Sequence, residues 1–353
     1  DGIRECSRDW SSDVCSFDLA GLVVVNPTHD VVADSRTREE ALRARAAAVS
    51  GPGRLSDGTP VTLMANAGNE NDAVSGAVAG AEGIGLFRTE LLFLDRQTEP
   101  SVEEQTSMYL RVFDAMAGRR VILRTLDAGS DKPVPFLNTV HEENPALGVR
   151  GWRLTRIADD VLTRQLEAVG IAASRTQADV WVMAPMIDTP QEAAEFAIRA
   201  RAAGIKKVGV MIETPAAALL ADKVLLEVDF ASLGTNDLTQ YVMAADRLDS
   251  RLSDLTSSWH PSVLRAIHSA ASSAASLSRP IGVCGESAAN PHLAAVLLGL
   301  GVTSLSMAPV AISEVRGFLA GVDRATCARA GQAALQASSA QEAAANARAI
   351  LGD

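Results

Sequence analysis

Short apolar runs alternate with longer amphipathic stretches from Val61 to the end of the chain. Runs rich in Val, Ile and Leu and bounded by Gly or polar residues are typical of buried strands, whereas Ala-rich stretches with helical spacing are typical of helices. About eight strands are predicted, at Val61–Asn66, Gly83–Arg88, Val121–Leu126, Val180–Met186, Val208–Glu213, Asp229–Gly234, Pro280–Cys284 and Ser304–Met307. Helices are predicted at Ala73–Ala79, Val102–Met116, Val161–Ala173, Pro190–Ala203, Pro215–Leu226, Pro261–Leu277, Pro291–Leu300 and Ile312–Ala320.

Such alternation of strands and helices over roughly 250 residues is the mark of an α/β fold of the (β/α)8 TIM-barrel type. An open, doubly wound sheet is the alternative arrangement of the same elements. No Gly-x-Gly-x-x-Gly follows the first predicted strand, which disfavours a dinucleotide-binding site. The sequence therefore predicts a TIM-barrel domain over residues 59–353.

The first part of the chain follows a different pattern. Residues 1–19 contain a Ser- and Asp-rich stretch without a sustained helix or strand period, and we leave them unassigned, with a non-native origin as one interpretation. Ala20–Asn26 is predicted as a short buried strand, and Ser35–Ser50 as a helix with Ser35 as its N-cap. Residues 20–58 are interpreted as the tail of a preceding domain plus a linker helix.

The composition fits this fold and limits the classes of binding partner that we expect. Hydrophobic residues make up 47% of the chain and aromatics 4%, so the core consists mainly of small and branched aliphatic side chains, which suit strands covered on both faces. The formal net charge of −11 argues against nucleic acid or an anionic membrane as the main partner. Apolar runs such as Ala294–Leu300 are shorter than the roughly 20 residues of a bilayer span. No secretory signal is visible and the four cysteines lack metal-site spacing, so we expect a reduced, cytoplasmic protein without membrane insertion.

Charged or reactive side chains stand at or just after the ends of most predicted strands from the second onward. In barrel enzymes the chemistry lies at the C-terminal ends of the strands, so this repeated placement is typical of a catalytic face. The residues are Arg88, Glu90, Arg124, Asp127, Glu213, Asn236, Asp237, Cys284 and Glu286.

Arginines are prominent among these residues. Arg88 ends Gly-Ile-Gly-Leu-Phe-Arg, Arg124 ends Val-Ile-Leu-Arg, and Arg247 follows Ala-Ala-Asp. The planar guanidinium matches the oxygens of a carboxylate or phosphate, so these residues predict a site for an anionic small molecule, to which Lys132 adds a point charge. The alternative is that each cation pairs with a nearby acid, namely Glu90, Asp127 or Asp246.

Glu213 and Asp237 are the candidate metal ligands. Glu213 closes the fifth predicted strand in Met-Ile-Glu-Thr-Pro, and Asp237 follows the sixth in Gly-Thr-Asn-Asp-Leu. Adjacent strands bring their tips together, and Mg²⁺ is usually held by one or two carboxylates, with substrate oxygens and water completing the octahedron. The alternative for Glu213 is a capping role at the helix that begins near Pro215. The neighbouring Asn236 carries an amide that can donate to a phosphate oxygen.

Cys284 lies in Gly-Val-Cys-Gly-Glu at the tip of the seventh predicted strand. A lone cysteine in such a place is commonly a small buried hydrophobe. With arginines and two carboxylates at neighbouring strand tips, an acid–base role is the better interpretation. The other cysteines and the five histidines have no comparable setting, and no histidine lies in a Gly-rich Thr-Ser-His segment.

At these motifs the chain resembles the phosphoenolpyruvate-utilising enzymes, and most nearly the C-terminal domain of Enzyme I of the bacterial sugar phosphotransferase system. The resemblance runs from about Ala20 to the C-terminus. The segments that carry it are Gly83–Arg96, Arg124–Lys132, Glu143–Arg153, Val208–Ala218, Ser232–Arg247 and Gly282–Glu286.

The resemblance implies roles for individual residues. Glu213 and Asp237 would hold Mg²⁺, and Cys284 would protonate the enolate carbon as pyruvate forms. Arginines and the metal stabilise the charge of the enolate and of the transferred phosphoryl group. The residues expected to bind phosphoenolpyruvate are Arg88, Arg124, Asn236, Asp237, Arg247, Lys132 and Arg150.

One departure from the family pattern limits this expectation. Complete Enzyme I begins with a helical domain that docks the carrier protein HPr and a domain that bears the phosphorylated histidine, whereas here only Ala20–Pro27 resembles the end of that domain. We therefore expect the chain to bind phosphoenolpyruvate without passing phosphate to HPr by itself. The resemblance also implies a homodimer formed through this domain. Pyruvate phosphate dikinase and phosphoenolpyruvate synthase are alternatives within the family, although dikinases typically have His-Met where this chain has Leu91 and Leu92. A non-catalytic dimerisation module and a metal-dependent aldolase or lyase are further alternatives.

Overall fold

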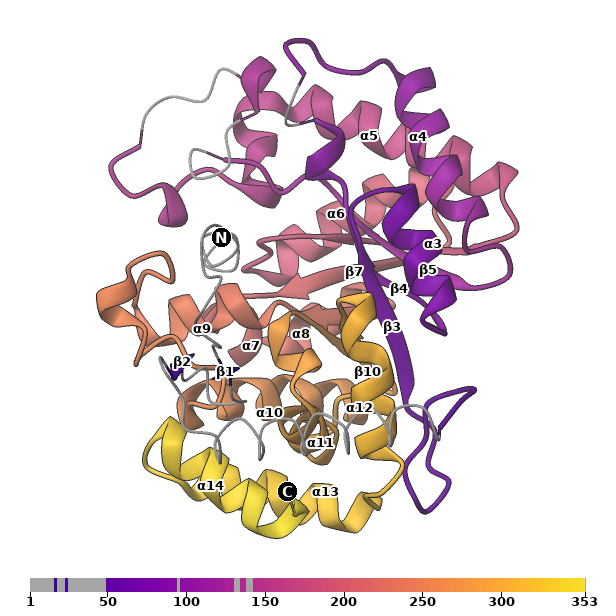
Figure 1. Ribbon diagram of the computed structural model, residues 1–353. Coiled ribbons are helices and arrows are strands. Elements are labelled where there is room, and N and C mark those ends of the chain that lie inside the picture. Colours follow the sequence, from indigo (N-terminus) through magenta and orange to yellow (C-terminus); the bar gives the residue numbers. More distant parts are fainter. Residues whose placement is uncertain are drawn as a thin grey trace.

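The computed structural model describes residues 49–93, 96–129, 134–137 and 142–352, together with the short strands β1 (Ser16–Phe17) and β2 (Val23–Val24). Within these residues, eight parallel strands close into a barrel in the order β10-β3-β4-β5-β6-β7-β8-β9 (Figure 1). The predicted (β/α)8 barrel is confirmed, and the open doubly wound alternative is wrong. The barrel strands are β3 (Thr62–Ala67), β4 (Gly83–Arg88), β5 (Arg120–Arg124), β6 (Asp179–Ala184), β7 (Lys207–Ile212), β8 (Phe230–Leu233), β9 (Ile281–Cys284) and β10 (Ser304–Met307).

The bounds of β4 and β10 agree with prediction, whereas β5, β6 and β7 end earlier than predicted. Leu126, Met186 and Glu213 therefore lie in the loops that follow these strands. All three side chains are buried, so burial continues past the last residue of each strand and does not mark the strand end. Met186 has a φ of 56°, in the left-handed region that few residues other than glycine adopt.

Helices surround the barrel (Figure 1). Several begin at side-chain caps: Ser101 and Glu104 form a capping box at the start of α4, and Thr189 and Glu192 form another at α6. The predicted helix Pro215–Leu226 is instead two helices that meet at Leu220. The helices are α3 (Glu70–Val78), α4 (Val102–Asp114), α5 (Thr155–Arg175), α6 (Pro190–Ala202), α7 (Pro215–Leu219), α8 (Ala221–Glu227), α9 (Thr235–Met243), α10 (Pro261–Ser276), α11 (Pro291–Gly299), α12 (Ile312–Leu319), α13 (Arg324–Gln336) and α14 (Ala340–Leu351).

Three of these helices were not predicted: α9, α13 and α14. Helix α9 begins directly after β8 at the Thr-Asn-Asp segment, to which no helix was assigned from the sequence. Helices α13 and α14 pack on each other and on α11 at the end of the chain, as Figure 1 shows. None of the helices among the described residues combines the length and apolar character needed to cross a bilayer.

Only a small part of the predicted N-terminal strand and helix lies within the described residues. The strand β2 lies inside the predicted strand Ala20–Asn26, and it pairs antiparallel with β1 in a separate two-stranded sheet. The predicted helix Ser35–Ser50 lies outside the described residues except for its last two positions.

The barrel has an outer and an inner core. The outer core, between strands and helices, is built largely of Ala, Val, Leu and Ile, as the composition predicts. The inner core is different, because it contains methionines, aromatic rings and a thiol. Trp181 and Phe230 meet there with ring centroids 4.8 Å apart. The members of this inner core are Met64, Leu86, Ile122, Trp181, Met183, Met211, Phe230 and Cys284.

Candidate functional site

Predicted site residues lie at the C-terminal ends of five of the eight barrel strands, namely β4, β5, β7, β8 and β9. Arg88 is the last residue of β4, Arg124 the last of β5 and Cys284 the last of β9. Glu213 follows β7 directly, and Asp237 lies in the first turn of α9 after β8. All are buried except Arg88, which is exposed at the rim. The site therefore lies where barrel enzymes place their chemistry.

Arg124 is held between two buried acids. Its Nη2 lies 2.9 Å from Glu90 Oε1, and its Nη1 lies 3.3 Å from Asp127 Oδ2. The Glu90 carboxylate also accepts a hydrogen bond from the Asp127 backbone N–H. Burial alone would lower the pKa of Arg124, but Glu90 and Asp127 outweigh it and raise the pKa above its usual value. Its Nε is buried and has no hydrogen-bond partner among the described residues, so one donor stays free.

Arg150 joins the two halves of the site. Its Nη2 donates to Asp127 Oδ2 at 2.9 Å, and its Nη1 donates to Asp237 Oδ1 at 3.0 Å. Arg247 approaches the other oxygen of the same carboxylate, with Nη1 3.4 Å from Asp237 Oδ2. Although burial opposes the charge, Asp127 and Asp237 raise the pKa of Arg150 above its usual value. A continuous series of alternating charges thus crosses the barrel mouth from β5 to α9.

These contacts decide between the alternatives left open for the arginines. Arg124 does pair with nearby acids, whereas Arg247 pairs with Asp237 and not with Asp246. Arg88 forms no ion pair with the described residues, because Glu90 turns toward Arg124. An ion-paired arginine can still bind an anion through its remaining donors, so pairing and binding are compatible here.

Glu213 is a buried carboxylate with one unused oxygen. Its Oε1 accepts from the Met186 N–H at 2.9 Å, while Oε2 has no partner among the described residues. Burial first, and then the negative charges of Asp237 and Asp127, raise the pKa of Glu213 to about 7. A Cβ at Gly234 would lie 2.6 Å from Oε2, so only glycine leaves room around this oxygen. Such an oxygen is suited to a cation.

The capping alternative for Glu213 is wrong. The Thr214 side chain accepts from the Ala217 N–H and caps α7, so the glutamate is not needed there. No group of three or more His, Cys, Asp or Glu side chains in the described part of the chain is arranged to hold a metal. Glu213 and Asp237 fit a Mg²⁺ site only of the two-carboxylate kind, in which substrate and water supply the remaining oxygens.

Cys284 carries the thiol at the inner edge of this site. Its Sγ accepts a hydrogen bond from Ser232 Oγ at 3.1 Å and faces the Leu233 carbonyl oxygen at 3.8 Å. Burial raises the pKa of Cys284 to about 11, although the Ser232 hydroxyl and the Arg124 charge act to lower it. The group is therefore a neutral thiol at physiological pH, which is the form that can give up a proton.

The comparisons identify the family to which these features belong. Residues 43–324 match the family described as PEP-utilising enzyme, PEP-binding domain. The chain belongs to this family. It is 47% identical to the phosphoenolpyruvate-protein phosphotransferase of Streptomyces coelicolor, over 94% of this chain and 60% of the relative. It is 40% identical to the phosphoenolpyruvate-protein phosphotransferase of Haloferax volcanii, over 90% of this chain and 59% of the relative.

A third relative is the multiphosphoryl transfer protein of Rhodobacter capsulatus, which is 39% identical over 85% of this chain and 37% of the relative. The chain of this PEP-binding domain thus spans about three fifths of the phosphotransferases named above and a smaller share of the multiphosphoryl transfer protein. These relatives carry the phosphotransferase name, which favours that branch of the family over the dikinase and synthase alternatives.

Sequence reasoning missed part of the machinery of this PEP-binding domain. Glu90 and Asp127 were noted as charged strand ends and as alternative partners of the arginines, and in the structure they pair with the two buried arginines. Ser232 was given no role, because a serine inside an apolar strand carries no distinctive signal. Among the predicted residues, Asn236 lies half-buried beside Asp237, and Lys132 lies outside the described residues.

Proposed function

We propose that this chain binds phosphoenolpyruvate together with Mg²⁺ and is the catalytic domain of a phosphoenolpyruvate–protein phosphotransferase, a transferase with a nitrogenous acceptor. The proposal rests chiefly on one observation, a buried thiol next to alternating arginines and carboxylates at the barrel mouth. In the complete cytoplasmic protein, phosphate passes to a histidine on a separate domain and then to HPr, and the barrel domain pairs as a homodimer. The names of the relatives support this assignment.

The arginines bind the phosphate and carboxylate of the substrate. Arg124 offers its unpartnered Nε, Arg247 is half-buried beside Asp237, and Arg88 reaches in from the exposed rim. Planar guanidinium groups suit both anionic ends of phosphoenolpyruvate. Asn236 donates its amide, Lys132 adds charge, and Arg150 supports the pocket by fixing Asp127 and Asp237.

Glu213 and Asp237 hold Mg²⁺ in this proposal. The unpartnered Oε2 of Glu213 supports this role, as does its proximity to the charge of Asp237. A bound Mg²⁺ neutralises charge on phosphoryl and enolate oxygens, which lowers the barrier to phosphoryl transfer. The protein contributes a fixed cluster of charges, so little reorganisation is needed during the reaction.

Cys284 is the acid. When the phosphoryl group leaves, the enolate of pyruvate remains, and it becomes pyruvate once its methylene carbon takes a proton. The thiol gives that proton: the S–H bond breaks, the C–H bond forms, and a thiolate is left. The Arg124 charge and the Ser232 hydroxyl stabilise this thiolate, since both act to lower the pKa of Cys284.

Calorimetry on the chain tests the binding part of the proposal. Phosphoenolpyruvate should bind in the presence of Mg²⁺, and removal of the metal with a chelator should weaken binding at least about tenfold, because the remaining charges no longer balance the phosphate. The absence of any heat of binding at several temperatures, with Mg²⁺ present, would contradict the proposal.

Binding of Mg²⁺ should weaken as the pH falls through about 7. The metal binds the carboxylate form of Glu213, and the raised pKa means that below pH 7 the metal has to displace a proton. Below that pH the affinity should fall by up to about tenfold per pH unit, measured by titration between pH 5.5 and 8.

A matched control separates this effect from a general response to acid. Glu314 on α12 is also partly buried, with a pKa raised by burial, but it lies outside the site. Glu314→Gln should keep the full pH dependence, whereas Glu213→Gln should bind Mg²⁺ weakly at every pH. An unchanged slope in Glu213→Gln would remove this residue from the metal site.

A further inference from the structure

A small cavity lies inside the barrel toward its N-terminal mouth, at the opposite end from the charge cluster. Arg120, Phe230 and Ser304, the first residues of β5, β8 and β10, line it. The cavity volume is about 20 Å³, which is enough for one ordered water, since a water needs roughly 10–15 Å³ and two to four polar partners.

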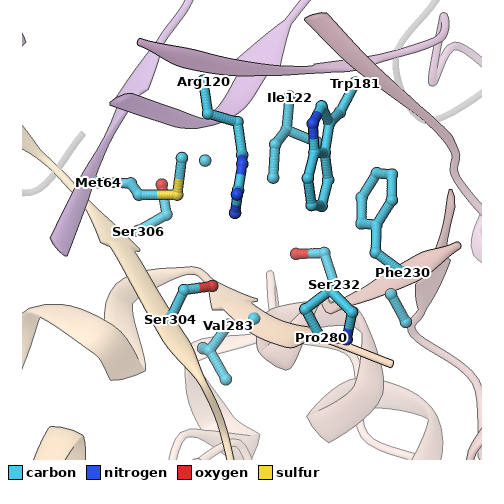
Figure 2. A pocket seen from close by; sticks show the side chains of 13 residues that line it. Met64, Arg120, Ile122, Trp181, Phe230, Ser232, Pro280, Val283, Ser304 and Ser306 are labelled. Atoms are coloured by element: carbon cyan, nitrogen blue, oxygen red, sulfur yellow. The ribbon is translucent and has the colours of Figure 1, made fainter. Parts of the chain in front are cut away.

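This cavity is polar, although most of the barrel interior is apolar. Ser232, Ser304 and Ser306 line it, and Figure 2 shows the Ser232 and Ser304 hydroxyls directed into the space near the Arg120 guanidinium. The buried Arg120 Nε lies 3.6 Å from Asp179 Oδ2 in an ion pair that is too long for a hydrogen bond, and it makes no hydrogen bond among the described residues, so it can donate to a water there. The guanidinium stacks 3.8 Å from the Trp181 ring centroid, and its side chain is 35% exposed, so the cavity meets solvent at the mouth.

Ser232 connects this cavity to the catalytic thiol. Its side chain lines the cavity, and its Oγ donates to Cys284 Sγ at 3.1 Å. The Ser232 side chain is 3% exposed and comes from the middle of β8, one strand away from Cys284 on β9. The hydroxyl hydrogen already points at the sulfur, which is the direction needed to protonate a thiolate.

We propose that Ser232 carries protons from water in this cavity to Cys284 and so restores the thiol after each turnover. This inference rests on the proposed role of Cys284 as the acid. The Ser232 O–H proton moves to the thiolate sulfur, the water replaces it on the serine oxygen, and bulk solvent at the mouth restores the water. One solvent proton thus replaces the one given to carbon, and no oxidant or other co-reactant is required.

The geometry favours proton supply to Cys284 from the cavity over proton supply from the substrate side. The substrate side of the thiol is occupied by the charge cluster and, during the reaction, by substrate and metal. Ser232 acts through Cys284 and touches no substrate, so it is a positioning residue that also relays the proton. Loss of the Ser232 hydroxyl should therefore slow the reprotonation of the Cys284 thiolate more than the first proton transfer from Cys284 to carbon.

The test compares the first turnover with later ones. The chain is mixed with phosphoenolpyruvate, Mg²⁺ and an excess of a phosphohistidine domain supplied in trans, and pyruvate is followed by rapid quench. Ser232→Ala should slow the first equivalent of pyruvate only modestly, because one hydrogen bond to the thiolate is lost, but should lower the steady-state rate at least about tenfold further, since only later turnovers need a reprotonated thiol. Ser232→Thr retains a hydroxyl and should restore the steady-state rate.

Ser306→Ala is the matched control. Ser306 is also 3% exposed and lines the same cavity, but its hydroxyl donates to Asn66 Oδ1 and not to the thiol. This variant should keep both rates and thus report the effect of altering the cavity alone.

The outcomes separate the relay from the proposed function. A steady-state rate in Ser232→Ala equal to that of the unmodified chain would overturn the relay, and so would an equal loss in both phases that Thr does not rescue. Loss of turnover from the first equivalent of pyruvate onward is the result expected for Cys284→Ala. A normal first turnover in that variant, or no turnover in the unmodified chain, would count against the proposed function itself.

Discussion

Arg124→Ala is expected to lose phosphoenolpyruvate binding and to destabilise the folded chain at the same time. The guanidinium is almost fully buried and forms ion pairs with Glu90 and Asp127. Removing one partner of a buried charge pair costs about 3–5 kcal/mol, because the remaining charges are left in a poorly solvated place. The loss of a charged donor to the ligand should weaken binding by at least about a hundredfold.

Arg247→Ala separates these two effects. Arg247 approaches Asp237 at the same site, but its side chain is 27% exposed, whereas that of Arg124 is 8% exposed. Its removal should also weaken binding of phosphoenolpyruvate but should lower the free energy of unfolding by only about 1 kcal/mol or less, since exposed pairs contribute little. Calorimetry gives the affinities, and urea unfolding without ligand gives the stabilities. An Arg124→Ala variant as stable as Arg247→Ala would contradict the buried charge cluster.

Cys284→Ala is expected to retain phosphoenolpyruvate binding and to lose pyruvate formation. Proton transfer by a positioned acid contributes about 10²–10⁴-fold to a rate, so the loss should fall in that range. Binding should change little, because the arginines and carboxylates keep their partners. The assay follows pyruvate with the phosphohistidine domain supplied in trans, and binding is measured separately by calorimetry. Undiminished phosphotransfer in this variant would exclude the thiol as the proton donor.

Cys327→Ala is the control for this experiment. Cys327 on α13 is also a buried free cysteine, and burial raises its pKa to about 11 as well. It lies in the outer core, away from the strand ends. Its substitution should leave pyruvate formation unchanged.

The thiol of Cys284 should also stay protonated well above pH 8, so deprotonation of this acid is not expected to reduce activity below about pH 10.

The barrel could be predicted because its signal is local and repeated. Strand β4 begins and ends where Gly83 and Arg88 interrupt an apolar run, so its bounds follow from the sequence. The ends of β5 and β6 do not follow from the sequence, because Leu126 and Met186 are still buried after the strands end. Helix α9 was missed for a related reason: its first turn is made of the polar residues that also form the site.

The position of candidate site residues at strand ends could be predicted, but their long-range contacts could not. Arg124, Glu213 and Cys284 stand at strand ends, and parallel strands bring such ends together. The contact of Arg150 with Asp237 spans 87 residues of sequence, and no local pattern indicates it. The same is true of Ser232, whose role depends on the register of β8 against β9. Pairing of this kind depends on the closed barrel as a whole.

The double pairing of Asp237 would link the two proposed ligands, Mg²⁺ and phosphoenolpyruvate, energetically. Both of its oxygens face arginines, so a cation that takes this carboxylate as a ligand competes with them. A displaced Arg247 gains free donors for an anion, which makes the affinity for each ligand rise when the other is bound. Because such linkage is reciprocal, the factor by which Mg²⁺ strengthens phosphoenolpyruvate binding equals the factor by which phosphoenolpyruvate strengthens Mg²⁺ binding. Until both ligands bind, the arginines and carboxylates at the barrel mouth would then balance one another's charges.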